Sequence, residues 1–222
     1  MRSSRSACGI PIHGLHLVSR VRGGLALVLV AFLFGVPSAR AQLPVKFSIA
    51  GGWNFPAGPA SITDFWTGGG TVAAGLSLRA SSRVLAWAEV GYYRLEFDAD
   101  AFESTIRALY PDVNVSGNDL QVIPVTVGAA MALTGWGNTR PYVTAGLGYY
   151  SISVTSPQTS GPGADDVALP DPSDDAFGAC FGFGVRTLVT PAATLFFDVT
   201  YHAAWASSDA LGFVPLRVGL RF

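Results

Sequence analysis

The last nine residues of the chain alternate strictly in polarity. Val214, Leu216, Val218, Leu220 and Phe222 are apolar, whereas the positions between them are cyclic, small or charged. A period of two is typical of a β-strand whose two faces meet different environments. In a soluble protein these alternating apolar residues would leave an apolar strand face exposed to water. The same pattern suits a strand that lies between lipid and a polar lumen. We therefore predict that this segment spans a membrane.

The same alternation recurs in seven earlier segments, each about as long as a tilted membrane strand. The connections between the segments are alternately long and short, as in bacterial outer-membrane barrels. The sequence thus predicts an all-β fold, an eight-stranded antiparallel up-and-down transmembrane β-barrel. The predicted strands cover residues 45–55, 71–79, 84–97, 120–133, 142–154, 176–186, 195–202 and 214–222.

The third of these segments, residues 84–97, alternates least cleanly, and Glu89 decides which of its faces is which. A charge on the lipid face at mid-membrane costs on the order of 2 kcal/mol. We therefore place Glu89 toward the lumen, together with Trp87 and Tyr93. Arg94 and Glu96 are expected beyond the membrane.

Aromatic side chains beside the long connections are expected to form an interfacial girdle, as in known outer-membrane barrels. Two others mark the opposite rim. The girdle residues are Trp53, Tyr92, Tyr149, Phe177, Tyr201 and Phe213, and the rim residues are Trp136 and Phe222.

The first 41 residues have the pattern of an export signal. Four arginines precede a short apolar run at 25–34, and Ala39-Arg40-Ala41 follows as a cleavage site. The alternative, an uncleaved membrane anchor, is disfavoured because the apolar core is short and Pro37 follows it. We predict a signal peptide at 1–41, removed after Ala41, and a barrel domain at 42–222.

Composition narrows the function. Only 13% of residues are charged, and the mean hydropathy is positive, at +0.38. Removal of the leader takes five of 14 basic residues, so 14 − 5 = 9 remain against 15 acidic ones, a formal charge of −6. This balance argues against nucleic-acid binding. Only Cys180 remains after cleavage, because Cys8 lies in the leader, so no internal disulfide or cysteine zinc site is expected. No cofactor or other metal is expected.

Three stretches resemble a known family. Residues 140–150 (RPYVTAGLGYY), residues 195–202 (LFFDVTYH) and the terminal ladder are similar to the outer-membrane β-barrel domain family of small OmpA- and OmpX-like proteins. The resemblance implies a bacterial outer-membrane location. It also implies that Val214, Leu216, Val218, Leu220 and Phe222 form the signal that the outer-membrane assembly machinery recognises. The likeness is expected to be confined to the barrel, without a following peptidoglycan-binding domain.

Eight strands enclose an interior that side chains just fill, so a wide water channel is not expected. On the predicted register, Glu89 and Asp198 face Arg217, and the last hairpin puts Asp198 and Arg217 at nearly the same height. We predict an ion pair between these two residues; the alternative is that luminal water solvates them. The remaining members of the predicted luminal charge network lie toward the short turns: Arg79, Arg186 and Arg221, with Lys46 beside them.

Two further luminal features bear on chemistry. His202 is the single histidine after the leader, and the next position on its strand face is Ala204 with no serine beside it. We therefore expect a hydrogen-bonded structural histidine rather than the base of a lipid A-modifying enzyme. The pairs Gly146/Gly148 and Gly182/Gly184 precede no helix, so they are not phosphate loops. They are expected to make room for luminal aromatic residues such as Tyr93 and Tyr150.

The predicted external loops are acidic, and a helical segment at 100–111 interrupts one of them. A solvated, repelling surface is the default interpretation, because no spacing matches a calcium loop. The sequence favours a non-enzymatic monomer that contacts outer-membrane lipid and lipopolysaccharide and has a structural or surface-interaction role. The alternatives are a narrow porin-like conduit and a lipid A-modifying enzyme. The acidic loop residues are Asp64, Asp98, Asp100, Glu103, Asp112, Asp119, Asp165, Asp166, Asp171, Asp174, Asp175 and Asp209.

Overall fold

The computed structural model describes residues 45–107, 114–116, 119–134, 137–154, 158–161, 174–206 and 210–222. The chain divides into two units, Met1–Gln42 and Leu43–Phe222, and all described residues belong to the second. The predicted leader and Trp136 lie outside them, as do Asp112, Asp165, Asp166, Asp171 and Asp209. In the described part of the chain, no helix is long and apolar enough to cross a membrane.

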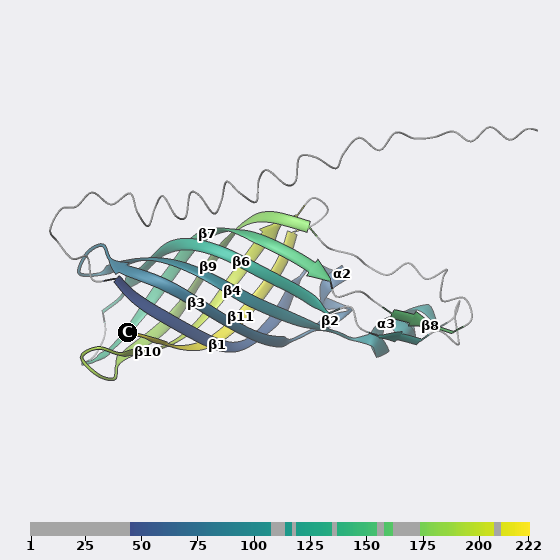
Figure 1. The fold of residues 1–222 in the computed structure, drawn as a ribbon, viewed down its shortest axis with the longest axis horizontal. Coiled ribbons are helices and arrows are strands. Elements are labelled where there is room, and N and C mark those ends of the chain that lie inside the picture. The colour runs from purple at the N-terminus through teal and green to yellow at the C-terminus, as the bar shows by residue number, and fades with distance from the viewer. Residues whose placement is uncertain are drawn as a thin grey trace, which may run out of the picture. The chain divides into compact units, whose positions relative to one another are not determined.

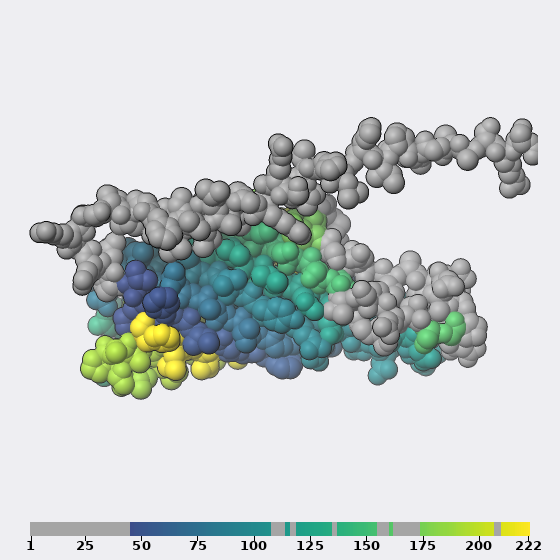
Figure 2. All heavy atoms as spheres, in the orientation of Figure 1, coloured from purple at the N-terminus to yellow at the C-terminus, as the bar shows by residue number. Residues whose placement is uncertain are grey.

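Eight long antiparallel strands form a closed barrel, which confirms the predicted fold. Strands that are neighbours along the chain pair with each other, and β1 pairs with β11 to close the ring. The closing pair is visible where the first strand, in dark blue, meets the last, in yellow (Figures 1 and 2). The barrel strands are β1 (Val45–Gly58), β3 (Gly69–Arg79), β4 (Val84–Phe97), β6 (Leu120–Ala132), β7 (Thr139–Val154), β9 (Asp174–Leu188), β10 (Thr194–Trp205) and β11 (Ala210–Arg221).

The two faces of the strands separate as the alternation predicts. On β9, Phe181 and Phe183 are 62% and 64% exposed, whereas Cys180 between the flanking glycines is buried. The terminal ladder shows the same pattern, because Leu216, Val218, Leu220 and Phe222 are exposed while Arg217 is buried. An outer wall of exposed large apolar side chains is stable only where lipid covers it.

One member of the predicted girdle is misplaced. Phe213 is fully buried and points into the lumen, where its ring stacks on that of His202. The reason is register, since Phe213 shares the inward phase of Arg217 on β11. Trp53, Tyr92 and Phe177 are exposed on the outer wall, in agreement with the prediction.

The ends of the barrel differ (Figure 1). At one end the strands are joined by tight turns such as 80–83 and 189–193, and we call this the short-turn end. At the other, the loop end, the chain forms additional elements that the alternation did not predict. These are α2 (Ala60–Thr63), β2 (Trp66–Thr67), and a separate two-stranded sheet of β5 (Asn114–Ser116) and β8 (Gln158–Ser160).

The predicted helix in the acidic loop is present but begins earlier and is shorter. It is α3 (Ala99–Ile106), and its N-cap is Asp98. The Asp98 carboxylate accepts a hydrogen bond from the Ala101 N–H at 2.9 Å, which satisfies a backbone donor of the first turn. The sixth predicted strand, residues 176–186, is also longer in the structure, because β9 runs from Asp174 to Leu188.

Glycines in the barrel wall make room for luminal aromatic rings. A Cβ at Gly146 would lie 2.8 Å from the Trp87 ring, and one at Gly184 would lie 2.6 Å from Tyr142. The sequence correctly predicted that wall glycines make room for luminal aromatic rings, but it named Tyr93 and Tyr150 rather than Trp87 and Tyr142. Tyr150 is instead accommodated by Gly178, and Tyr93 by Gly91.

The half of the lumen nearest the loop end is filled by apolar side chains. They come from the inward faces of six barrel strands. Ile62 from α2 and Trp66 from β2 join the same cluster at the loop end. The filling leaves Tyr93, Tyr150 and Phe213 with no accessible surface. The cluster comprises Ile62, Trp66, Tyr93, Leu95, Leu120, Val122, Tyr150, Ile152, Ala176, Ala204, Leu211 and Phe213. We call it the apolar plug.

The close approach of Trp87 to the barrel wall predicts that Gly146→Val destabilises the barrel. A valine there overpacks the lumen, at a cost of about 1–3 kcal/mol. The matched control is Ala145→Val, because Ala145 is exposed on the outer wall one residue away. Urea unfolding of the refolded protein in detergent measures both, and equal midpoints would contradict the proposed packing of Trp87.

Candidate functional site: the luminal charge cluster and the basic mouth

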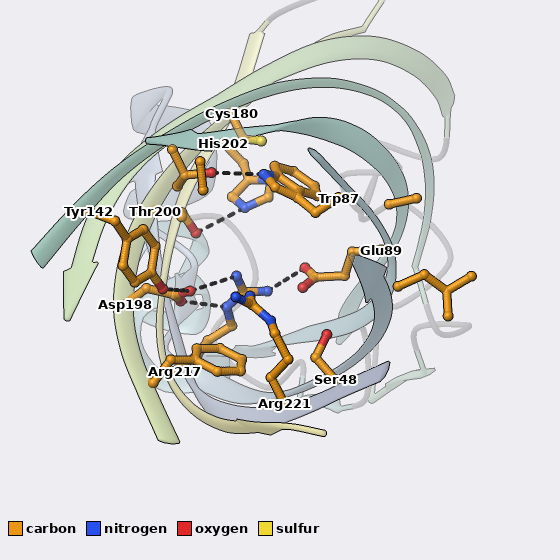
Figure 3. Close-up of a pocket in the computed structure, with 15 residues that line it drawn as sticks. Ser48, Trp87, Glu89, Tyr142, Cys180, Asp198, Thr200, His202, Arg217 and Arg221 are labelled. Atoms are coloured by element: carbon orange, nitrogen blue, oxygen red, sulfur yellow. Dashed lines mark hydrogen bonds and ion pairs between the residues drawn. The ribbon is translucent and has the colours of Figure 1, made fainter. Parts of the chain in front are cut away.

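Arg217 lies at the centre of the lumen and joins two carboxylates (Figure 3). Its Nε donates to Asp198 Oδ1 at 2.9 Å, and its Nη1 donates to Glu89 Oε1 at 2.5 Å. Asp198 and Arg217 are direct partners in the pairing of β10 with β11, so the ion pair predicted from the last hairpin is present. Glu89 reaches the same guanidinium from β4.

Tyrosine hydroxyls complete this cluster. The Tyr142 hydroxyl donates to Asp198 Oδ2 at 3.0 Å, and Arg217 Nη1 donates to the Tyr93 hydroxyl at 3.2 Å. Arg217 and Asp198 are only 6% and 4% exposed. At such burial, charges are tolerated only when they are paired and hydrogen-bonded. We refer to Glu89, Asp198 and Arg217 as the luminal ion triad.

A small polar cavity of about 40 Å³ adjoins the triad. Its wall includes Ser48, Thr144, Thr200 and Cys180 as well as the triad itself. That volume holds a few water molecules at most. Trp87 borders the cavity and donates from its indole N–H to the Thr144 hydroxyl at 3.0 Å, which fixes the ring across the lumen. The interior of the barrel here is packed rather than open.

Both ring nitrogens of His202 are occupied. Its Nδ1 lies 3.0 Å from the Tyr150 hydroxyl and its Nε2 lies 3.2 Å from the Thr200 hydroxyl. The ring is 2% exposed and stacks on Phe213 with centroids 4.9 Å apart. The ring therefore lies between the triad and the apolar plug, with a hydrogen-bond partner at each nitrogen.

The arginines predicted near the short turns form a separate group. In the described ranges, Arg79, Arg186 and Arg221 make no ion pair, and the predicted luminal network therefore splits in two. Arg221 lies against the Phe196 ring at 5.3 Å. Together with Lys46 and Arg140 these residues line a cavity of about 510 Å³ at the short-turn end. We call these five cations the basic mouth.

Several acidic loop residues have structural roles that sequence reasoning missed. Asp119 pairs with Arg94 and also accepts the Phe97 N–H at 3.2 Å, and Glu103 accepts the Val115 N–H at 2.8 Å. Asp98 caps α3, as described above. Asp64, Asp100 and Asp175 are exposed at the loop end. The acidic loops are thus partly a folded framework.

The comparison with known proteins agrees with this architecture. The profile of the outer membrane protein beta-barrel domain family matches residues 26–222. The chain belongs to this family. Membership of the family places this chain in the bacterial outer membrane. By the general rule for such barrels, the short-turn end faces the periplasm and the loop end faces outward.

The chain is similar to several solved structures at low sequence identity. Neisserial surface protein A, NspA, is 13% identical with a TM-score of 0.56, over 80% of this chain and 95% of that one. The N-terminal β-barrel domain of Pseudomonas aeruginosa OprF is also 13% identical, with a TM-score of 0.46 over 80% and 97%. Ail of Yersinia pestis, solved with the heparin analogue sucrose octasulfate, has 13% identity and a TM-score of 0.41 over 80% and 99%. No curated protein sequence matches this chain.

The luminal ion triad predicts a large penalty for Arg217→Ala. The change leaves Asp198 and Glu89 buried without their cation, which costs about 3–5 kcal/mol of unfolding free energy. The control is Arg140→Ala, because Arg140 is exposed at the mouth and forms no ion pair within the described residues. Its unfolding midpoint should be unchanged or higher. Equal losses in the two variants would contradict the structural role of the triad.

Proposed function

We propose that this barrel is a non-enzymatic outer-membrane protein that anchors a folded, acidic surface platform outside the cell. The observation that carries the proposal is the filled lumen. The apolar plug occupies the outward half and the luminal ion triad occupies the centre. Such an interior serves stability rather than transport, and leaves the loop end as the part of the molecule that meets other molecules.

The loop end supports this proposal because it is built as structure. Phe102 and Val115 pack together with Phe65 and Phe97 in a small apolar core of their own. The carboxylates of Asp98, Glu103 and Asp119 fasten the backbone around that core. A preorganised surface loses less conformational entropy on binding than a flexible one. Its remaining exposed carboxylates favour partners that present positive charge.

The conduit and enzyme alternatives have weaker support. The conduit would require ions to pass Tyr93, Tyr150 and Phe213, which have no accessible surface. An enzyme using His202 would need a base with a free nitrogen near its substrate, whereas both nitrogens already have partners inside the barrel. We therefore keep the structural and surface-interaction role as the proposal.

Biogenesis follows the same reasoning. We infer that the leader at 1–41 is removed on export and that the exposed ladder of β11 is presented to the assembly machinery. The ladder is continuous on the lipid face from Leu216 to Phe222, and β11 is the strand that closes the barrel against β1. The barrel closes within one chain, which supports a monomer that contacts lipid and lipopolysaccharide through its outer wall.

The filled lumen predicts that the purified barrel does not conduct. Planar bilayer recordings of the wild type should show no discrete conductance steps. Phe213→Ala removes a buried ring from the apolar plug and should permit brief conducting openings. Phe177→Ala, on the exposed outer wall, should show no conductance. Stable steps from the wild type would contradict the proposal and favour the conduit.

The acidic platform predicts binding of a cationic probe to the loop end. Fluorescent oligolysine should bind the protein in nanodiscs, and raised salt should weaken the binding because exposed charges are screened. The variant Asp64→Asn/Asp100→Asn/Asp175→Asn should bind several-fold more weakly. Ser104→Asn is the control, because it changes the same surface without changing charge. Undiminished binding by the triple variant would contradict the acidic-platform proposal.

A further inference from the structure

The inward positions nearest the periplasm are occupied by cations on five of the eight barrel strands. Lys46, Arg79, Arg140, Arg186 and Arg221 come from β1, β3, β7, β9 and β11 respectively. Each has the same phase as the luminal residues of its strand, so the pleat directs all five side chains toward the axis. Their convergence is therefore a property of the register, and chance surface charge does not explain it.

Among the described residues, no carboxylate lines the cavity that these five cations surround. Its other described lining residues include Ser77, Asn138 and Thr194, which are neutral donors or acceptors. Asp198 and Glu89 lie deeper in the lumen and are already engaged by Arg217. Within the described residues, no carboxylate forms an ion pair with a cation of the basic mouth. Guanidinium groups remain protonated, so this positive charge is permanent.

The clustering of cations in the basic mouth lowers the stability of the folded barrel. Arg140 and Arg186 are direct cross-strand partners of β7 and β9, and like charges in that position are destabilising. Arg186 is also repelled by Arg221 and Arg79. The Nε of Arg221 is buried and has no hydrogen-bond partner among the described residues. A cluster that costs stability and leaves donors unused is typical of a binding site.

We propose that the basic mouth is a periplasm-facing binding site for a small anion that carries two or more phosphate groups. Adjacent guanidiniums, such as those of Arg140 and Arg186, match the oxygens of one phosphate through paired N–H donors. The remaining cations stand on other strands of the wall, so one anionic centre does not neutralise them all. The cavity of about 510 Å³ has room for a second and third anionic group.

Access is from one side only. The small cavity, the luminal ion triad and the apolar plug follow in order beyond the basic mouth, so a ligand enters and leaves through the periplasmic opening. The site is consequently independent of the acidic platform at the other end of the barrel. Its ligand is either a free oligophosphate of the periplasm or the head group of a diphosphate lipid in the inner leaflet.

The test is calorimetric titration of the refolded mature chain, in nanodiscs of zwitterionic lipid, with sodium tripolyphosphate. The wild type should bind tripolyphosphate. Arg186→Gln should raise the dissociation constant about tenfold, because the substitution removes a charged hydrogen bond. The matched control is Arg83→Gln, in the exposed turn at the same end but outside the cavity. Its affinity should equal that of the wild type.

Stability supplies a second readout. Without tripolyphosphate, Arg186→Gln should unfold at the same or a higher urea concentration than the wild type, because repulsion with Arg140 is relieved. With tripolyphosphate, the wild type should gain stability and the variant should gain much less. A variant that is simply misfolded would lose stability in both conditions, so folding defects are distinguishable from loss of the site.

Three results would overturn the proposal. They are absence of wild-type binding, equal weakening by Arg83→Gln and Arg186→Gln, and equally tight binding of the tricarboxylate tricarballylate, which would remove the preference for phosphate. Nanodiscs that contain diphosphatidylglycerol, compared with discs of equal charge made with phosphatidylglycerol, identify the source. Competition by the diphosphate lipid supports a lipid head group, and equal affinity in the two kinds of disc supports a free oligophosphate.

Discussion

The structure depends on the ion pairing of one buried cation, Arg217, with carboxylates from two other strands. Arg217 joins β11 to Asp198 on the neighbouring β10 and to Glu89 on β4 across the lumen. At the filled centre of the barrel, a charge has no route to bulk water, so it must be neutralised by another luminal residue. This requirement fixes the register of the last hairpin and the side of β4 that faces inward. It also explains why Tyr142 and Tyr93 direct their hydroxyls to the same point.

The lumen is therefore arranged in levels along the barrel axis. The apolar plug occupies the outward half, the luminal ion triad holds the centre, and the basic mouth opens at the periplasmic end. Because the first two levels are filled, the two ends of the barrel are chemically separated. The exposed carboxylates of the loop end and the cations of the basic mouth have opposite charge, so in our proposal the two ends bind different partners. Glycines in the wall allow this filling, since Trp87 and Tyr142 occupy space that a Cβ at Gly146 or Gly184 would take.

Much of this arrangement follows from local alternation in the sequence. A period of two gave the strands, their lipid faces and the partnership of Asp198 with Arg217, because pairing across a tight hairpin is a matter of counting. The same counting places Phe213 inward with Arg217, yet its position beside a loop made an interfacial role look natural. The elements at the loop end were missed for a different reason. Trp66 and Val115 are held by tertiary contacts, and short segments of this kind have no periodicity to detect. The hydroxyl partners of His202 depend on ring positions across the lumen and were likewise out of reach.

The central claim is that the apolar rungs of a closed barrel face lipid while the charges are held within. Gel migration of the outer-membrane fraction, with and without boiling, tests it most directly. A closed barrel remains compact in cold detergent, so the unboiled protein should migrate faster than the boiled protein and should be recovered with the outer membrane. Identical mobility in both samples, together with recovery of the processed chain in a detergent-free periplasmic extract, would contradict the account.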